Sequence, residues 1–223
     1  MQFTYHPLAK DSQLIVDGEL HKYLFKVRRH DKNQNLFFRN LEDNYLYQYK
    51  VVNISRRETS LVLVNKEEKI IKPSKFLHIF WCVVDHKNIE KMLPSLNEIG
   101  VSKITFVYCK YSQKNIKLNY EKLNKILINS SSQSGRSDII QLDHIDNIED
   151  LFNNYSNLYM FNFSHNHIIN HKNNIENIFI GPEGGFCDDE IKQFDSDHIV
   201  GVDSNMILRS ETAVVSVASM LLL

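Results

Sequence analysis

The chain has 223 residues, of which 43% are hydrophobic and 24% charged, and its formal net charge is −1. This composition is typical of a soluble globular protein with one large or two small domains, and the balanced charge does not by itself indicate a nucleic-acid binder. No stretch has the length and apolar character of a membrane span, and the first residues lack the pattern of a signal peptide. We therefore expect a cytoplasmic protein without a membrane partner.

Charge and cysteine content vary along the chain. Residues 1–72 carry 13 Lys and Arg against 9 Asp and Glu, whereas the remaining residues carry 13 against 18. This asymmetry suggests two modules, of which the basic N-terminal module is better suited to bind a polyanion. Cys82, Cys109 and Cys187 are widely spaced without a CxxC pair, which predicts reduced, mostly buried thiols.

The first seventy residues predict a small β-rich module, which we take as a domain over residues 1–70. Strands are expected at 3–5, 14–16, 36–38, 45–54 and 60–64, with a brief helix at 18–26. Residues 66–73 are charged and end in a proline, which predicts a linker to the next domain.

From residue 75 to residue 223, alternating strands and helices predict an α/β domain with a mainly parallel sheet. Strands are expected at 76–84, 104–108, 158–163, 177–180 and 198–202, and helices at 88–99 and 120–131. The first of these helices has a proline, Pro94, in its interior, and Gly100 is expected to end it. Four aromatic side chains are assigned to the core of this layer: Phe76, Phe80, Trp81 and Phe106.

Three of the seven glycines fall within five residues, at Gly181, Gly184 and Gly185, directly after an apolar strand. Such clustering indicates a sharp backbone bend or the close approach of a ligand, although a plain tight turn is the alternative. A helix is expected to follow, with Asp188 as its N-cap. Because three acidic residues occupy its first turn, a phosphate ligand is disfavoured and a ligand that is not an anion fits better.

A second dense motif, at residues 207–213, precedes a terminal helix that is apolar on nearly every face. Such a helix must be buried, either against the sheet or against a partner subunit. Arg209 and Glu211 flank its start, and they form either a structural ion pair or part of a functional site.

A zinc site is conceivable at His165, His167 and His171, because they include a His-x-His pair. No cysteine or acidic residue lies near them in the sequence, so a surface loop is the favoured interpretation and no metal is expected.

Five short motifs of the chain resemble the motifs of one known family. IGPEGGF at residues 180–186 and ILRSETA at 207–213 are similar to the ribosomal RNA small subunit methyltransferase E family, which methylates uridine N3 in 16S rRNA and belongs to the SPOUT superfamily. EIGV at 98–101, QSGR at 133–136 and His21 followed by KVR at 26–28 extend the resemblance over most of the chain. The chain departs from the family pattern at Pro94, Ser95, Asp203, Ser204 and Met206, which leaves loop shape and RNA contact unspecified there.

The resemblance implies a C-terminal domain of SPOUT type, knotted as a deep trefoil, behind a small PUA-like β-barrel that binds RNA. It also implies transfer of a methyl group from S-adenosylmethionine to N3 of a decoding-region uridine, position 1498 in the usual rRNA numbering. The cofactor-binding residues it implies are Phe161, Ile180, Gly181, Pro182, Gly184, Gly185, Ile207, Leu208, Thr212 and Ala213.

Methyl transfer to uracil requires loss of the weakly acidic N3 proton and no metal. We assign Arg209 to stabilising the negative charge that develops on the uracil oxygens. Glu183 or Glu211 either acts as the base or orients Arg209, and the sequence does not choose between them.

RNA contacts are expected from basic residues of the N-terminal module, for which a solvated helix end is the alternative interpretation, and from one arginine of the QSGR segment. These residues are Lys22, Lys26, Arg28, Arg29, Lys32, Arg39 and Arg136. The partners implied are 16S rRNA in the small ribosomal subunit and a second copy of the chain, bound through the terminal helix. Two alternatives remain: a non-catalytic RNA-binding or ribosome-assembly factor with the same fold, and a methyltransferase of this superfamily that acts on another RNA.

Overall fold

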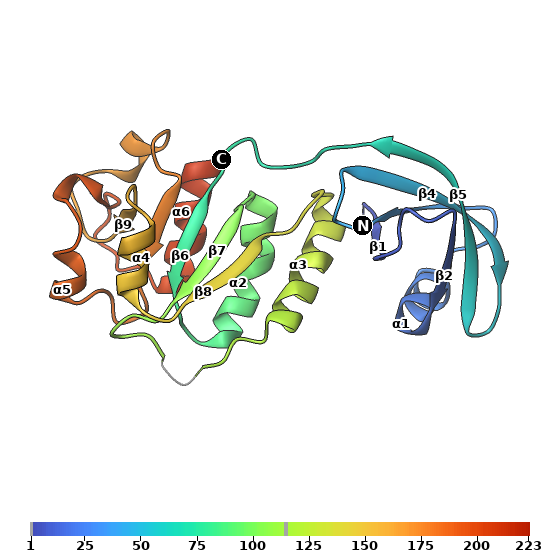
Figure 1. The fold of residues 1–223 in the computed structure, drawn as a ribbon, viewed down its shortest axis with the longest axis horizontal. Helices are drawn as coiled ribbons and strands as arrows, with labels where there is room; N and C mark the ends of the chain where they lie inside the picture. The colour runs from blue at the N-terminus through green and yellow to red at the C-terminus, as the bar shows by residue number, and fades with distance from the viewer. Residues whose placement is uncertain (1, 114–115) are drawn as a thin grey trace. The chain divides into compact units, whose positions relative to one another are not determined.

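A computed structural model describes residues 2–113 and 116–223 of the chain. The backbone divides into two compact units (Figure 1). One unit comprises Met1–Lys72 together with Ser131–Ile139, and the other comprises Pro73–Ser130 and Ile140–Leu223. The division near residue 72 falls inside the expected linker, whereas the assignment of Ser131–Ile139 to the first unit is not foreseen by the sequence analysis. None of the described helices combines the length and apolar character that crossing a bilayer demands.

The first unit is built on a five-stranded sheet with the strand order β1-β3-β4-β5-β2. Its elements are β1 (Thr4–Tyr5), β2 (Gln13–Asp17), α1 (Gly18–His21), the π-helical turn η1 (Lys22–Val27), β3 (Asn35–Arg39), β4 (Tyr45–Ile54) and β5 (Glu58–Glu68). Strand β2 alternates exposed and buried residues, so that Leu14 and Val16 face a core with Phe38 and Tyr49.

The linker predicted at residues 66–73 overlaps the end of strand β5. Residues 66–68 continue strand β5, because Glu67 and Glu68 pair with Leu46 and Tyr45 of β4. Charged side chains at these positions are accommodated because the end of the strand is exposed.

The second unit is an α/β layer around a six-stranded sheet in which every pairing between strands is parallel. The strand order is β11-β9-β10-β6-β7-β8. The strands are β6 (His78–Cys82), β7 (Lys103–Val107), β8 (Gln141–Ile145), β9 (Tyr159–Phe161), β10 (Asn177–Ile180) and β11 (Ile199–Val200). The helices are α2 (His86–Ile99), α3 (Tyr120–Ser134), α4 (Ile148–Asn154), α5 (Asp188–Ile191) and α6 (Ser210–Leu222), with 3-10 turns η2 (Ile168–His171) and η3 (Ser196–His198).

Both faces of this sheet are covered (Figure 1). All five residues of β6 are buried, as a continuous apolar run predicts for a central parallel strand. Phe80 packs in a cluster with Leu151 of α4 and Ile191 of α5, whereas the next residue, Trp81, reaches α6 on the other face. Helix α2 packs against α6 on that second face and is bonded to α3.

Three local expectations can be compared directly with the structure. Helix α2 keeps Pro94 in its interior and ends at Gly100, as predicted. Trp81, Phe80 and Phe106 are buried in the core, but the assignment of Phe76 to the core is wrong. The strand begins at His78, two residues later than expected, and Phe76 remains half exposed before it.

Candidate functional site

The glycine-rich bend follows a buried strand at the centre of the sheet. Strand β10 lies between β9 and β6 and ends at Ile180, so the bend emerges at the carboxyl-terminal edge of the sheet. In open α/β sheets this edge is where ligands commonly bind. Helix α5 begins after the bend with Cys187 at its N-cap, and not with Asp188 as expected. The reason is that the Glu190 carboxylate accepts a hydrogen bond from the Cys187 N–H at 2.8 Å, which fixes Cys187 outside the helix.

Two glycines of the bend permit close contacts that a side chain would obstruct. A Cβ atom at Gly181 would lie 3.1 Å from the Phe186 ring, and one at Gly184 would lie 3.2 Å from Tyr111 Cβ. The clustering of glycines therefore reflects tight packing of the bend on its neighbours.

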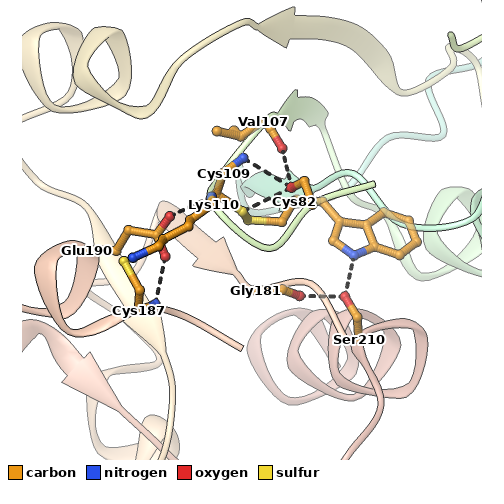
Figure 2. The surroundings of a disulfide bond; sticks show 10 residues. Cys82, Val107, Cys109, Lys110, Gly181, Cys187, Glu190 and Ser210 are labelled. Atoms are coloured by element: carbon orange, nitrogen blue, oxygen red, sulfur yellow. Dashed lines mark hydrogen bonds between the residues drawn. A yellow bond between two sulfur atoms is a disulfide. The ribbon is translucent and has the colours of Figure 1, made fainter. Parts of the chain in front are cut away.

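A second bend, at residues 202–208, leads into α6 and is tied to the first. The Ser210 hydroxyl donates a hydrogen bond to the Gly181 carbonyl at 2.5 Å and accepts one from Trp81 Nε1 at 2.9 Å. Figure 2 shows Ser210 between the Gly181 carbonyl and the indole nitrogen. One hydroxyl thus joins the start of α6, the first bend and strand β6.

A cavity of about 270 Å³ lies between the two bends, and we call it the two-bend pocket. Nine of the ten residues expected to bind a cofactor line it; the exception is Thr212, whose side chain is exposed at the start of α6. Glu183 also lines it. The lining residues to which the sequence analysis gave no part in the site are Asn162, Phe163, Phe186, Val202, Ser204, Met206 and Ser210. Phe186 and Ser210 belong to the motifs at residues 180–186 and 207–213, so their place in the pocket could have been predicted from these motifs.

The chemistry of this lining favours a ligand without negative charge. Most of the wall is apolar side chain or glycine backbone, and among the residues that the structure describes no Lys or Arg forms part of it. The acidic residues Glu183 in the bend and Asp188 and Asp189 in the first turn of α5 would repel an anion. An uncharged aromatic ring or a cation is therefore better suited to the pocket than a phosphate.

The three expected catalytic residues lie in different environments. Arg209 extends into solvent with its side chain 82% exposed, and its Nη1 is 3.9 Å from Glu211 Oε1. The Glu211 side chain is 15% exposed, and its Oε2 is buried without a hydrogen-bond partner among the described residues. Glu183 is exposed at the pocket wall. Arg209 and Glu211 are thus placed together at the entrance of α6.

Most of the basic residues expected to contact RNA in the N-terminal unit are exposed on or just after the helical segment 18–27. Lys22 pairs with Glu19, and the Arg28 guanidinium stacks on Tyr23 and donates a hydrogen bond from Nε to its hydroxyl. Lys26, Arg29 and Lys32 are exposed to solvent.

Arg39 is not part of this basic surface, and its assignment to RNA contact is wrong. Its side chain is buried, with 1% exposure, and donates hydrogen bonds to the carbonyls of Asn44 and Lys69. Arg136 is also buried, at 5% exposure, and its Nε lies 2.5 Å from Asp138 Oδ1. Its guanidinium is held within the protein and is not presented to solvent.

The expectation of three reduced thiols is also wrong. Cys82, at the end of β6, and Cys109, just after β7, form a disulfide, and Cys187 is free (Figure 2). These two strands are neighbours, and the register pairs Cys82 with Val107. The parallel pairing therefore brings together two cysteines that lie 27 residues apart in the sequence.

The histidine-rich segment shows no arrangement for a metal. His167 Nδ1 accepts a hydrogen bond from the Ile169 N–H, and His171 Nε2 lies 2.6 Å from Asn166 Oδ1. Within residues 2–113 and 116–223, no cluster of three or more His, Cys, Asp or Glu is placed to hold an ion.

A parallel sheet with covered faces and a pocket formed by two tied bends at its carboxyl-terminal edge defines an open α/β domain with a ligand-binding site. The family model of the RNA methyltransferase domain matches residues 72–222. The ribosomal RNA small subunit methyltransferase E of Helicobacter pylori is 37% identical over 222 residues, which covers 98% of each chain. This chain belongs to the ribosomal RNA small subunit methyltransferase E family.

Solved structures share the fold over nearly the whole chain. The ribosomal RNA small subunit methyltransferase E from Neisseria gonorrhoeae, bound to S-adenosyl methionine, superposes with a TM-score of 0.75 at 18% identity and covers 98% of this chain and 95% of its own. A Legionella pneumophila protein solved in complex with the bound cofactor SAM gives a TM-score of 0.81 at 20% identity and covers 99% and 96%.

Proposed function

We propose that this protein transfers a methyl group from S-adenosylmethionine to N3 of a uridine in 16S rRNA, at position 1498 in the usual rRNA numbering. The observation that carries the proposal is the two-bend pocket, whose two walls are tied together by Ser210. Family membership supports the rRNA substrate, and the cofactor named for the Neisseria protein supports the methyl donor.

The residues of the pocket fit this cofactor. S-adenosylmethionine supplies a methyl group carried by a cationic sulfonium, and it has an adenine ring but no phosphate. Backbone groups of Gly181 and Leu208 would bind the adenine edge, while Phe161, Ile180 and Ala213 would contact its faces. The acidic residues beside the glycine bend tolerate a cation, and Gly185, where a Cβ atom would meet nothing within 4 Å, leaves the main chain accessible to a ligand.

The remaining chemistry belongs to Glu183 in the glycine-rich bend and to Arg209 and Glu211 at the start of α6. The uracil N3–H is mostly protonated at neutral pH, so a base must accept its proton. Glu183 and Glu211 are the carboxylates of the site that can serve, and Glu211 can alternatively orient Arg209, to which it is adjacent. The exposed Arg209 guanidinium is free to approach the uracil oxygens and stabilise their negative charge.

We further propose that the N-terminal unit is a PUA-like module that binds rRNA phosphates through Lys22, Lys26, Arg28 and Arg29. The exposure of these side chains and the five-stranded sheet of this unit support this role. Arg136 would take part only if its pairing with Asp138 opens.

The family resemblance also leads us to propose a trefoil knot in the C-terminal unit and a homodimer through α6. The strand order is compatible with a knot, since β11 follows β10 in the chain but lies beside β9. The exposed Leu223 and the partly exposed side chains of α6 support the dimer.

Two measurements test the main proposal. Calorimetric titration with S-adenosylmethionine should show saturable binding, and S-adenosylhomocysteine should compete for it. Incubation with labelled cofactor and either isolated small subunits or naked 16S rRNA, followed by mapping of the product, should place the label on uridine N3. Binding without transfer to either RNA would contradict the proposed reaction. Absence of cofactor binding would indicate a non-catalytic RNA-binding factor, and label on another RNA would indicate a different substrate.

A further inference from the structure

An exposed tyrosine lies directly beside the glycine-rich bend, on a turn that the proposed function does not use. Tyr111 follows strand β7 and is 51% exposed, although it is a large, mostly apolar side chain. Its Cβ, Cγ and Cδ2 atoms are the nearest neighbours of the space in front of Gly184, which lines the two-bend pocket. Tyr111 is therefore next to a residue that lines the pocket.

The turn that carries Tyr111 is fixed on both sides. Within it, the Ser112 hydroxyl accepts a hydrogen bond from the Cys109 N–H at 3.0 Å, and the Ser112 N–H donates one to the Cys109 carbonyl at 3.1 Å. The disulfide joins Cys109 to Cys82 of β6. Such anchoring limits the motion of an otherwise exposed loop.

Glu190 connects this turn to the glycine-rich bend. Its carboxylate is buried and accepts one hydrogen bond from the Lys110 N–H at 2.9 Å and another from the Cys187 N–H at 2.8 Å (Figure 2). The two segments beside the pocket are thus bridged by a single side chain. The Lys110 ammonium in turn lies 5.8 Å from the centre of the Tyr111 ring.

We propose that Tyr111 is a substrate-binding residue that stacks on a nucleobase of the RNA at the methylation site, with Lys110 contacting an adjacent phosphate. This inference rests on the proposed function. N3 lies on the pairing edge of uracil, so the target base must leave its stack before it can react. Single-stranded RNA bases are commonly held by stacking on aromatic side chains, and a neighbouring cation adds contact to the backbone.

The structure allows a substitution that removes the aromatic face alone. The Tyr111 atoms nearest to the space in front of Gly184 are Cβ, Cγ and Cδ2, and leucine keeps Cβ, Cγ and a branch of two carbons there. Tyr111→Leu should therefore keep the packing on the bend while losing the ring, whereas Tyr111→Phe keeps the ring and loses only the hydroxyl. Phe76→Leu is a matched control, because Phe76 is 50% exposed and precedes β6 at the opposite, amino-terminal edge of the same sheet.

The experiment compares the four full-length proteins by kcat/KM for whichever RNA the wild type methylates, by the Kd for S-adenosylmethionine and by sedimentation. We expect Tyr111→Leu to lower kcat/KM by about 5- to 150-fold, the usual effect of losing one base–aromatic stack. Tyr111→Phe and Phe76→Leu should stay within about twofold of the wild type, and all four proteins should bind the cofactor equally, because nothing but RNA contact is changed.

Several outcomes would overturn the proposal while leaving the reaction intact. The first is an unchanged kcat/KM for Tyr111→Leu, and the second is an equal loss of kcat/KM in Tyr111→Phe. The third is a loss of cofactor affinity in Tyr111→Leu that parallels its loss of kcat/KM. The fourth is a change of oligomeric state in Tyr111→Leu, which would indicate that a second copy of the chain contacts this ring. Failure of the wild type to methylate any RNA would instead remove the proposed function, and this inference with it. A melting temperature for each variant identifies any effect that comes from folding.

Discussion

Arg209 is the residue whose position is most informative for the proposed chemistry. Its guanidinium is exposed, whereas its neighbours Leu208 and Ser210 line the two-bend pocket. Removing it should therefore leave the pocket wall in place and withdraw only a charge that acts on the RNA substrate. We expect Arg209→Ala to bind S-adenosylmethionine within about threefold of the wild type and to lose about 100- to 1,000-fold in kcat, the usual effect of losing one oxyanion-stabilising donor.

Single-turnover methylation and calorimetry on the same preparations check this expectation. Glu211→Gln is the companion variant, because it keeps the shape of the side chain beside Arg209. Full activity of Arg209→Ala would refute the assignment of this residue to catalysis.

His78 gives the fold a pH dependence that can be measured independently of the reaction. It is buried in β6 with Nε2 2.7 Å from Thr105 Oγ1, and burial, reinforced by the nearby Lys103 charge, lowers its pKa to about 3. The unfolded chain, with an ordinary histidine pKa of about 6.5, binds a proton that the folded protein rejects. Stability is therefore highest above about pH 6.5 and falls as the pH decreases from there toward 3.

Because of this group, we expect the free energy of unfolding to be about 2 kcal/mol lower at pH 5 than at pH 7. His78→Gln should show a correspondingly flatter pH dependence in urea unfolding. His165→Gln, which replaces an exposed histidine, should retain the wild-type slope. If the unfolding free energies of all three proteins depended equally on pH, His78 would take up its proton in the folded protein as readily as in the unfolded chain.

At the scale of elements, the site depends on one hydroxyl that joins two bends and a strand. Ser210→Ala would leave both the Trp81 indole N–H and the Gly181 carbonyl without their shared partner in a buried environment. We expect a loss of about 1–3 kcal/mol in unfolding free energy, since buried polar groups would be left unsatisfied. The affinity for S-adenosylmethionine should fall as well, because the two walls of its pocket are no longer tied.

Ser219→Ala is the matched control for this prediction. It lies in the same helix, but its hydroxyl bonds only to the Val215 carbonyl one turn earlier. Urea unfolding should therefore separate the two variants clearly. Equal, small losses in both would show that the tie at Ser210 does not stabilise the site.

The elements also show how far the sequence predicts this fold. Strands at 177–180 and 45–54 are confirmed with those bounds, because each is an apolar or alternating run with clear limits. Strand β8 and helix α4 were missed. The strand lies at the edge of the sheet with no fully buried residue, so its sequence lacks the apolar signal of a central strand.

The candidate site was predictable where it depends on local motifs and not where it depends on distant pairings. The two motifs pointed to the residues of the two-bend pocket because each bend is continuous in sequence. The disulfide between Cys82 and Cys109 and the bridge from Glu190 to Lys110 join segments that only the folded sheet brings together. The burial of Arg39 likewise depends on carbonyls of Asn44 and Lys69, which a count of basic residues does not reveal.

At the scale of the whole molecule, the two units divide the proposed tasks. The N-terminal unit offers an exposed set of basic side chains, and the C-terminal unit carries the pocket. The segment Ser131–Ile139, which contains the QSGR motif, groups with the N-terminal unit although it begins within the last turn of helix α3. The Ile71 N–H donates to Ser137 Oγ at 2.7 Å, and the Gln2 N–H donates to the Ser132 carbonyl at 2.9 Å. These bonds explain why a family motif lies outside the unit to which the sequence order assigns it.

The proposed homodimer can be tested through the terminal helix. One side of α6 is buried against α2 and β10 within the chain, whereas Met220 and Leu222 remain partly exposed and Leu223 is exposed. A charge at Met220 should disrupt a partner contact at this surface, because an unpaired carboxylate is costly in an apolar interface. In analytical ultracentrifugation we expect the wild type at twice the 26.2 kDa of one chain and Met220→Glu shifted toward the single-chain mass. Val64→Glu, a similar change at an exposed position of the N-terminal unit, should leave the wild-type mass unchanged. A monomeric wild type that still binds the cofactor would show that the pocket is complete within one chain.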